Sequence, residues 1–299
     1  MSFNIIKKDN ISFNPFFIKT LKNNKLTQIP HNTPSLICSK SSNGKYCINT
    51  TIKNSDVFNK ITTSIYLQNC PFYPKTHIFY NQNNFNNIKL DNKYYYVKPK
   101  YGNNSKNISL YKQKELIIGN PSNLQFPLIF QEEVQNLKTF NKHKYDLRIH
   151  ILYILKNNDV IPLLYKDAIK RQSFKDINSP MSPDSIFTNV KDLSKINEQL
   201  IQSYHPPELI KCLKNANQFI IPKLKKIKIT HELELLMTGY DIIIDNNNKH
   251  WILEINCNPA LNYDDEIRKE TDKMLIEILY IILSYNNNKK IKPIKFIKL

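Results

Sequence analysis

The chain has 299 residues and a mass of 35.3 kDa, enough to bury a core in one large domain or in two to three smaller lobes. Its net charge of +18 suits an acidic partner, but nearly all of that charge is lysine among frequent asparagine runs, so a codon bias explains it equally well. The five cysteines show no paired spacing, so neither a disulfide framework nor a zinc site is suggested, and no apolar run approaches the length of a membrane span. With no signal-sequence pattern at its start, the chain is expected in the cytoplasm.

The first 132 residues predict short strands separated by polar loops. Phe3 to Lys7 and Ser64 to Leu67 are β-like runs, and the polar stretch from Asn81 to Asn87 predicts a surface loop. Runs rich in aromatic and β-branched residues, from Tyr94 to Lys98 and from Leu128 to Gln131, predict two further strands.

The loop from Lys98 to Ile108 holds Gly102, one of only four glycines in the chain. A lysine at a strand end, followed by a flexible polar loop, is able to cradle phosphate groups. Glycine, asparagine and proline also mark ordinary surface turns, and taken alone this loop favours such a turn.

An ionic strand face is predicted at Lys144, Asp146, Arg148 and His150, which alternate with apolar residues. A solvated outer face of an antiparallel sheet gives the same alternation. The chain has only three arginines, however, and two of them, Arg148 and Arg171, lie close in sequence to the hairpin predicted after this face. Because arginine grips phosphate or carboxylate with two parallel hydrogen bonds, their placement favours an anion-binding role.

The elements after this face are a hairpin, a loop and helices. Arg148 to Leu155 and Val160 to Tyr165 predict the hairpin, joined through residues 156–159, and residues 172–187 predict a loop. Glu198 to Phe219 and Glu232 to Met237 predict helical segments that prolines interrupt.

The segment from Gly239 to Pro259 predicts a second hairpin with a loop from Asn246 to Lys249. This loop sets Asp241 opposite Glu254, and the alternation of a strand places Asn256 on the same face as Glu254. The three oxygen donors suit Mg2+ held against nucleotide phosphates. The polar face of an exposed hairpin is the alternative, but without a cation these groups would repel or lack partners.

The same register sets Asp245 opposite His250 and turns Trp251, Leu253 and Ile255 to the other face.

The last elements are a long helix and a tail. Apolar residues recur at helical spacing from Asp264 to Leu283 and predict the best helix of the chain. The lysine-rich tail after Asn286 is expected to be loose.

These motifs, in this order, resemble those of the tubulin tyrosine ligase family, a branch of the ATP-grasp ligases. One motif is Lys144-Tyr145-Asp146-Leu147-Arg148, similar to the family's K-F/Y-D-I/L-R. The other is Gly239-Tyr240-Asp241 with Leu253 to Pro259, similar to G-F/Y-D and L-I/L-E-V/I-N-x-x-P. Supporting matches, within a resemblance that covers about residues 70 to 285, are Tyr73 to Thr76, Lys98-Pro99, Gln131 to Val134, Arg171 and Thr188-Asn189.

The resemblance implies roles for residues at the matching positions. Lysines would contact ATP phosphates, a hinge would present backbone to adenine, and an asparagine would assist near the phosphates; the implied ATP-binding residues are Lys98, Lys106, Gln131, Glu132, Glu133, Val134, Lys144 and Asn189. Asp241, Glu254 and Asn256 would hold Mg2+. Arg148 and Arg171 would stabilise the γ-phosphate and a developing acyl phosphate, and Asp146 would orient the ribose or a substrate.

The implied fold is α+β, an ATP-grasp fold in which two α/β lobes with antiparallel sheets sandwich ATP, with a small N-terminal α/β domain. We expect the N-terminal domain at residues 1–88, the central lobe at 89–132 and the C-terminal lobe with the metal site at 133–285. Residues 286–299 would form the tail.

The implied function is an ATP- and Mg2+-dependent ligase, which activates a carboxylate as an acyl phosphate that an amine then attacks. Such phosphoryl transfer needs positioning and charge neutralisation more than a nucleophilic side chain. We expect glutamate, or else tyrosine or glycine, as the amino acid co-substrate and a protein such as the tubulin C-terminal tail as acceptor. A monomer associated with microtubules is expected, and nucleic acid is not an expected partner because its usual binding motifs are absent.

The chain departs from the family pattern at two places. Ser105-Lys106-Asn107 stands where the phosphate loop has G-x-G, and Glu133 stands where the hinge has an aromatic residue. The missing glycines motivate an alternative, a catalytically inactive relative that binds tubulin or another polyanion. The retained metal ligands and arginines favour the enzyme, and Mg2+-dependent ATP affinity separates the two hypotheses.

Overall fold

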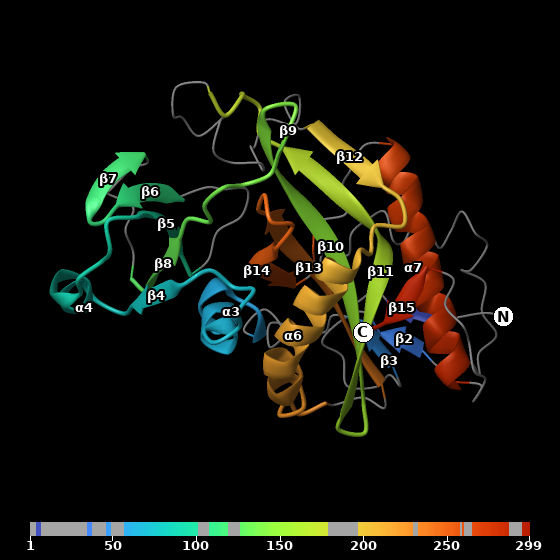
Figure 1. The fold of residues 1–299 in the computed structure, drawn as a ribbon. Coiled ribbons are helices and arrows are strands. Elements are labelled where there is room, and N and C mark those ends of the chain that lie inside the picture. The colour runs from blue at the N-terminus through green and yellow to red at the C-terminus, as the bar shows by residue number, and fades with distance from the viewer. Residues whose placement is uncertain are drawn as a thin grey trace.

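The computed structural model describes a large and a small β-sheet with helices packed on them (Figure 1). The described residues are 4–6, 35–37, 46–48, 57–100, 108–118, 126–178, 197–229, 233–257, 259, 265–286 and 295–299. Among the helices in these residues, none is long and apolar enough to cross a membrane.

The larger sheet has ten strands. They are β1 (Asn4–Ile6), β2 (Ser35–Ile37), β3 (Tyr46–Ile48), β9 (Thr139–Phe140), β10 (His143–Lys156), β11 (Asp159–Gln172), β12 (Asn197–Ile201), β13 (Leu233–Ile244), β14 (His250–Cys257) and β15 (Phe296–Lys298). The main order is β1-β2-β3-β13-β10-β11-β12, with β14 paired to β13, β15 to β11 and β9 to β10. Only the pairs among β1, β2, β3 and β13 are parallel in the described sheet.

The smaller sheet has five strands, all antiparallel, in the order β4-β8-β5-β6-β7. They are β4 (Thr76–Phe79), β5 (Tyr94–Pro99), β6 (Ser109–Lys112), β7 (Glu115–Ile118) and β8 (Leu128–Glu132). Four helices accompany the sheets in the described residues: α3 (Lys60–Leu67), α4 (Gln82–Asn87), α6 (Pro207–Leu224) and α7 (Asp265–Asn286). This α+β architecture is compatible with the expected ATP-grasp fold.

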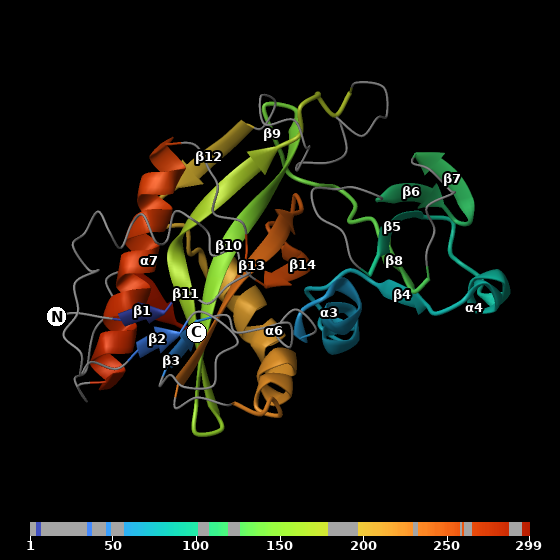
Figure 2. The ribbon, with the colours of Figure 1, turned by 180° about the vertical axis from the view of Figure 1, so that it is seen from behind.

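Helices cover both faces of the larger sheet (Figure 1, Figure 2). On one face, Ile149 of β10 packs with Leu213 of α6 in the main hydrophobic core. On the other, His150 and Ile169 lie against Met274 of α7. Because neighbouring residues of a strand point to opposite faces, β10 contributes to both layers.

The smaller sheet has one apolar face and one polar face. Val97 and Phe130 lie in its own aromatic core, where Phe130 meets Phe79 edge to face at 5.0 Å between ring centroids. Tyr96 and Gln131, which pair across β5 and β8, lie on the opposite face. That polar face turns toward the larger sheet, since Gln131 Nε2 donates to the Leu253 carbonyl of β14 at 3.2 Å.

Several predicted elements are confirmed: the strands at Tyr94 and Leu128, the hairpin after Arg148 and the long C-terminal helix. The hairpin extends further than predicted, with 14 residues in each of β10 and β11. Its turn is shorter, because Lys156 already pairs with Asp159. Asn157 and Asn158 make the turn with φ of 50° and 62°, the left-handed conformation that asparagine tolerates better than most residues.

Two predictions before residue 90 are wrong. Ser64 to Leu67 is the end of α3, and the stretch from Asn81 to Asn87 contains α4. Each helix starts after an asparagine whose side chain caps it, since Asn59 Oδ1 accepts from the amides of Ile61 and Thr62 at 3.0 Å each. Asparagine favours both turns and N-caps, and a pattern of asparagines alone does not separate the two.

Two stretches predicted as helical are strands. Glu232 to Met237 enters β13, which is buried along its whole length at the centre of the larger sheet. Residues from Glu198 to Ile201 belong to β12, and α6 begins only at Pro207, the first helical position, where proline fits. Leucine, glutamate and methionine favour helices intrinsically, but pairing between neighbouring strands outweighs that preference here.

Three predicted segments, the loop at 172–187, the C-terminal tail and the N-terminal domain, are described only in part. Of the predicted loop at 172–187, Ser173 to Asn178 lies outside helices and strands, and the remainder falls beyond the described residues. The tail was expected to be loose, but Phe296 to Lys298 pairs with β11 as β15. The separate N-terminal domain stays a prediction, because the described residues before 57 are only strands β1 to β3.

Candidate functional site

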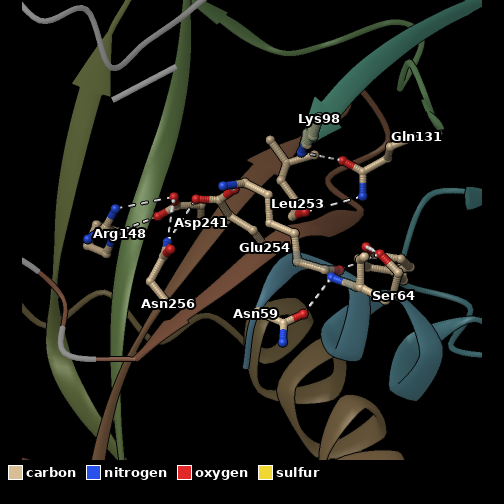
Figure 3. A network of polar contacts seen from close by, with 12 residues as sticks. Asn59, Ser64, Lys98, Gln131, Arg148, Asp241, Leu253, Glu254 and Asn256 are labelled. Atoms are coloured by element: carbon tan, nitrogen blue, oxygen red, sulfur yellow. Dashed lines mark hydrogen bonds and ion pairs between the residues drawn. The ribbon is translucent and has the colours of Figure 1, made fainter. Parts of the chain in front are cut away.

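The candidate site lies where the polar face of the smaller sheet meets the β13–β14 hairpin (Figure 3). Asp241 of β13 and Glu254 of β14 are directly opposite each other, as the sequence predicts. The predicted position of Asp245 opposite His250 is wrong, because His250 pairs with Ile244 and the loop has one more residue.

A β-bulge at Leu253 corrects this shift of register. Ile242 pairs with Ile252 and the next pair is Asp241 with Glu254, so Leu253 is the extra residue on β14. As a result, Ile252 and Ile255 both belong to the main core, and the prediction that Trp251, Leu253 and Ile255 share a face is wrong. The bulge therefore aims Glu254 at Asp241 while it keeps both isoleucines buried.

The three predicted metal ligands lie within hydrogen-bonding distance of one another. Asn256 Nδ2 donates to Asp241 Oδ2 at 3.2 Å and to Glu254 Oε1 at 2.9 Å. In the described part of the chain, no group of three or more His, Cys, Asp and Glu side chains forms a metal site. A cation here would therefore depend on the Asn256 amide as its third donor.

Both predicted catalytic arginines lie on the same carboxylate. Arg148 Nε and Nη2 donate to the two Asp241 oxygens at 2.5 and 3.2 Å, and Arg171 Nη2 lies 3.0 Å from Asp241 Oδ1. Arg171 Nε also donates to Asp146 Oδ1 at 2.6 Å. All four side chains are buried, so this cluster of two arginines and two aspartates is shielded from water.

The cluster keeps Asp241 ionised. Burial raises the pKa of Asp241, but Arg148 and Arg171 outweigh burial and hold the pKa well below its usual range. The Asp241 oxygens already accept four contacts, from Arg148 twice, Arg171 and Asn256. Two carboxylate oxygens offer about four acceptor sites, so a cation at Asp241 would displace at least one of these donors.

The donor set fits Mg2+ in kind. Two carboxylates and one amide supply hard oxygens, and a half-turn of the Asn256 amide would present Oδ1 where Nδ2 now lies. Glu254 keeps a side chain that is 20% exposed, with Lys60 Nζ at 4.0 Å as a nearby cation. Glu254 is thus more open to solvent than Asp241, whose side chain is 8% exposed.

Gly239 is required by the path of Arg148. A Cβ added at Gly239 would lie 2.8 Å from Arg148 Cδ and 2.8 Å from Pro259 Cβ, too close for either contact. The glycine lets the arginine side chain cross the backbone of β13 on its way to Asp241.

Lys98 projects into the same space from the smaller sheet. Its Nζ donates to Gln131 Oε1 at 2.7 Å, and its side chain lines a small cavity with Lys60 and Glu254. Burial lowers the pKa of Lys98 to about 8, with Lys60 also lowering it and Glu254 opposing the shift. A phosphate placed here would restore the charged form, because an anion favours the ammonium.

Lys144 reaches the smaller sheet through a tyrosine. Its Nζ donates to the Tyr96 hydroxyl at 2.8 Å, and that hydroxyl donates to Glu133 Oε1 at 3.1 Å. Val134, the residue after Glu133, is buried. The Glu132 carboxylate pairs with Lys93 at 2.5 Å. The side chain of Glu132 thus points to Lys93, and its hinge role stays a prediction.

Two predicted site residues, Lys106 and Asn189, lie outside the described residues. Two residues that lie at the site, Lys60 and Tyr96, were not predicted from the sequence. Lys60 gave no signal because it is one lysine among many, and only the α3 fold brings it to Glu254. Tyr96 could have been found, since it alternates with Lys98 and so shares the face of that lysine.

Comparisons with known proteins match this chain to a family and to relatives that are named for the modification of tubulin. A family model described as the tubulin-tyrosine ligase family matches residues 170–290, which include Arg171, Asp241, Glu254 and Asn256. The chain is 23% identical over 234 residues to tubulin glycylase 3D of Tetrahymena thermophila, covering 68% of this chain and 22% of that protein. It is 40% identical over 76 residues to the probable alpha-tubulin polyglutamylase Ttll1 of the same organism, covering 24% of this chain and 18% of that protein.

A third relative is the probable tubulin polyglutamylase TTLL9 of Bos taurus, 28% identical over 177 residues, which is 50% of this chain and 37% of that protein. The matches thus span well under half the length of each of these relatives.

Proposed function

Since this chain belongs to the tubulin tyrosine ligase-like family, we propose that it is an ATP- and Mg2+-dependent ligase. The bond that it forms is an amide or isopeptide bond between an amino acid and a protein acceptor. The observation that carries the proposal is the meeting of Arg148, Arg171 and Lys98 with Asp241 and Glu254 between two sheets. Cations beside paired carboxylates suit a phosphate chain and its metal ion.

Different residues of the chain would bind different parts of ATP. Lys98 and Lys144 bind phosphate oxygens, and the backbone from Gln131 to Val134 contacts the adenine. Asp241, Glu254 and Asn256 would hold Mg2+, which would neutralise charge on the phosphates.

Arg148 and Arg171 would supply the γ-phosphate with donors in the loaded site. In the free chain both guanidiniums contact Asp241. If the Asp241 oxygens served as metal ligands, arginine donors released from them would be available to the γ-phosphate, whose geometry suits their fixed arrangement. Asp146, bound to Arg171 at 2.6 Å, keeps that guanidinium in place.

The reaction runs in two steps. A carboxylate oxygen attacks the γ-phosphorus, the bond from the γ-phosphorus to the bridging oxygen breaks, and ADP leaves with an acyl phosphate formed. An amine then attacks the acyl carbon, loses a proton and expels inorganic phosphate, which leaves an amide. The arginines stabilise the charge that develops on the transferred phosphoryl group.

Glutamate is the proposed amino acid, and the acidic C-terminal tail of tubulin is the proposed acceptor. Two of the relatives named above are described as tubulin polyglutamylases and one as a tubulin glycylase. The net charge of +18 favours an acidic acceptor, because a positive field raises the local concentration of polyanions.

Incubation of the chain with tubulin, MgATP and labelled glutamate, glycine or tyrosine tests the proposal. We expect incorporation of glutamate that requires both ATP and Mg2+. No incorporation of any amino acid, together with no ATP binding, would sink the proposal. Failure of both would favour the inactive tubulin-binding relative, whereas binding of MgATP without incorporation would contradict tubulin as the acceptor.

A further inference from the structure

Tyr96 lies between two opposite charges that belong to different parts of the site. Its hydroxyl accepts from Lys144 Nζ at 2.8 Å and donates to Glu133 Oε1 at 3.1 Å. Lys144 Nζ also lies 4.8 Å from the centre of the Tyr96 ring. One tyrosine on β5 thus contacts both the hinge carboxylate and a lysine of the larger sheet.

Glu133, at the predicted hinge, places a carboxylate beside Tyr96. Its position is fixed, because the Glu133 backbone N–H donates to the Tyr94 carbonyl at 2.9 Å and Gln135 Nε2 donates to Glu133 Oε2 at 3.2 Å. The hinge therefore holds a negative charge close to a lysine that the proposed function assigns to phosphate.

A direct ion pair with Glu133 would disable that lysine. Lys144 is 9% exposed, and opposite charges attract strongly where water is excluded. A carboxylate that received the ammonium directly would compete with the nucleotide for it. A hydroxyl both donates and accepts, so Tyr96 satisfies the lysine and the carboxylate while it keeps them apart.

We propose that the Tyr96 hydroxyl is a positioning group that separates Lys144 from Glu133 and so keeps the Lys144 ammonium directed at the nucleotide. The inference rests on the proposed function, because it takes the ligand of Lys144 to be the phosphates of ATP.

The second phosphate lysine is held in the same manner. Lys98 Nζ donates to Gln131 Oε1 at 2.7 Å, and the Gln131 amide is fixed in turn by the Leu253 carbonyl at 3.2 Å. Both lysines thus have a neutral oxygen of the smaller sheet as a partner. A neutral acceptor orients an ammonium without cancelling its charge, which leaves that charge for an anionic ligand.

Three variants test the inference through MgATP affinity measured by calorimetry. Tyr96→Phe removes the hydroxyl, Tyr96→Phe with Glu133→Gln also removes the competing charge, and Tyr95→Phe removes a hydroxyl from the neighbouring position on the other face of β5. Thermal unfolding of each variant shows that it is folded.

We expect Tyr96→Phe to weaken MgATP binding roughly tenfold, the loss typical of a hydrogen bond to a charged group. The double variant should return to within roughly threefold of the wild type, because the rival for Lys144 is gone. Tyr95→Phe should bind like the wild type. Rescue by removal of a charge separates positioning from packing, since a lost packing contact would not be restored by Glu133→Gln.

Two results would overturn the inference while the proposed function stands: wild-type affinity in Tyr96→Phe, or a loss in Tyr96→Phe that Glu133→Gln does not restore. A wild-type chain that fails to bind MgATP would overturn the proposed function and this inference together.

Discussion

The residues that matter most are those that the chain uses sparingly. Of its three arginines, Arg148 and Arg171 meet on Asp241 at the site. Of its four glycines, Gly239 lies beneath the side chain of Arg148. At Asn157 and Asn158 asparagine makes a turn with positive φ, so glycine is not needed there, whereas at Gly239 the absence of a side chain is needed.

Gly239→Ala tests this packing directly. The added methyl would meet Arg148 Cδ and Pro259 Cβ, both at 2.8 Å, and overpacking of this kind costs about 1–3 kcal/mol. We expect a lower free energy of unfolding and weaker MgATP binding, since Arg148 must move. Ile242→Val on the same strand is the control, because it costs about 1 kcal/mol and Ile242 lies in the main core on the opposite face of β13. Equal MgATP affinity in both variants would contradict the role of Gly239.

The pH dependence of nucleotide binding tests Lys98. Its pKa in the free chain lies at about 8, chiefly because of burial. An anion binds the charged form, so affinity is full below this pKa and falls as the pH rises through it. We expect the MgATP affinity to drop roughly fivefold between pH 8 and pH 9, as the charged fraction of Lys98 falls. Lys98→Arg should remove this dependence, because arginine stays charged. A flat profile in the wild type would show that the Lys98 charge does not contribute.

At the scale of elements, hairpins were predictable and their flanks were not. Alternating residues and turn residues identify the β10–β11 and β13–β14 hairpins, and these carry Asp146, Arg148, Asp241 and Glu254. The prediction of β13 failed before Thr238, where Glu-Leu-Glu-Leu-Leu-Met favours a helix but lies in the centre of a sheet. The burial of β13 between neighbouring strands is set by the tertiary fold, so it cannot be predicted from the local sequence pattern.

The bulge at Leu253 is a second feature that the alternation of residues in the sequence does not predict. A simple hairpin count and the observed register agree at Asp241 and Glu254 but disagree at His250. The extra loop residue and the bulge compensate each other, so the predicted facing pair is right although the loop is not. Such paired irregularities leave the site intact and are invisible to alternation alone.

The C-terminal strand β15 joins β11 to α7 through one lysine. Lys295 Nζ lies 2.7 Å from Asp167 Oδ2 and also contacts Glu270 Oε1, while the Lys295 backbone N–H donates to Glu277 Oε1 at 2.7 Å. Asp167 and Glu270 are both buried. Removal of the ammonium would leave two buried carboxylates without their shared cation.

We therefore expect Lys295→Met to lower the free energy of unfolding by about 3 kcal/mol, the cost of breaking a buried ion pair. Lys273→Met is the matched control, because Lys273 pairs with the same Glu270 at 3.0 Å from a side chain that is 65% exposed. The control should lose less than about 1 kcal/mol. Urea unfolding measures both values, and equal losses would contradict a special role for Lys295.

At the scale of the whole molecule, the site exists because two sheets with different cores meet at their polar faces. The smaller sheet supplies Lys98, and the larger sheet supplies Asp241 and Arg148 (Figure 3). Helix α3 adds Lys60, whose Nζ lies 4.0 Å from Glu254. The predicted ligands on one hairpin follow from alternation, but the approach of Lys60 does not. It depends on how α3 packs against β8 and β14, which is a property of the assembled fold.

Mg2+-dependent ATP affinity is the most direct test of the central claim that these faces hold MgATP. Glu254→Gln keeps the size of a side chain that is 20% exposed, so the variant should unfold at the wild-type temperature. Glu115→Gln, at an exposed position of β7, is the control. We predict that Mg2+ strengthens ATP binding in the wild type and in the control, and that Glu254→Gln weakens this binding at least roughly tenfold, a loss that even hydrogen-bonding partners of metal ligands typically cause. Full Mg2+-dependent ATP binding by a folded Glu254→Gln variant would contradict the account.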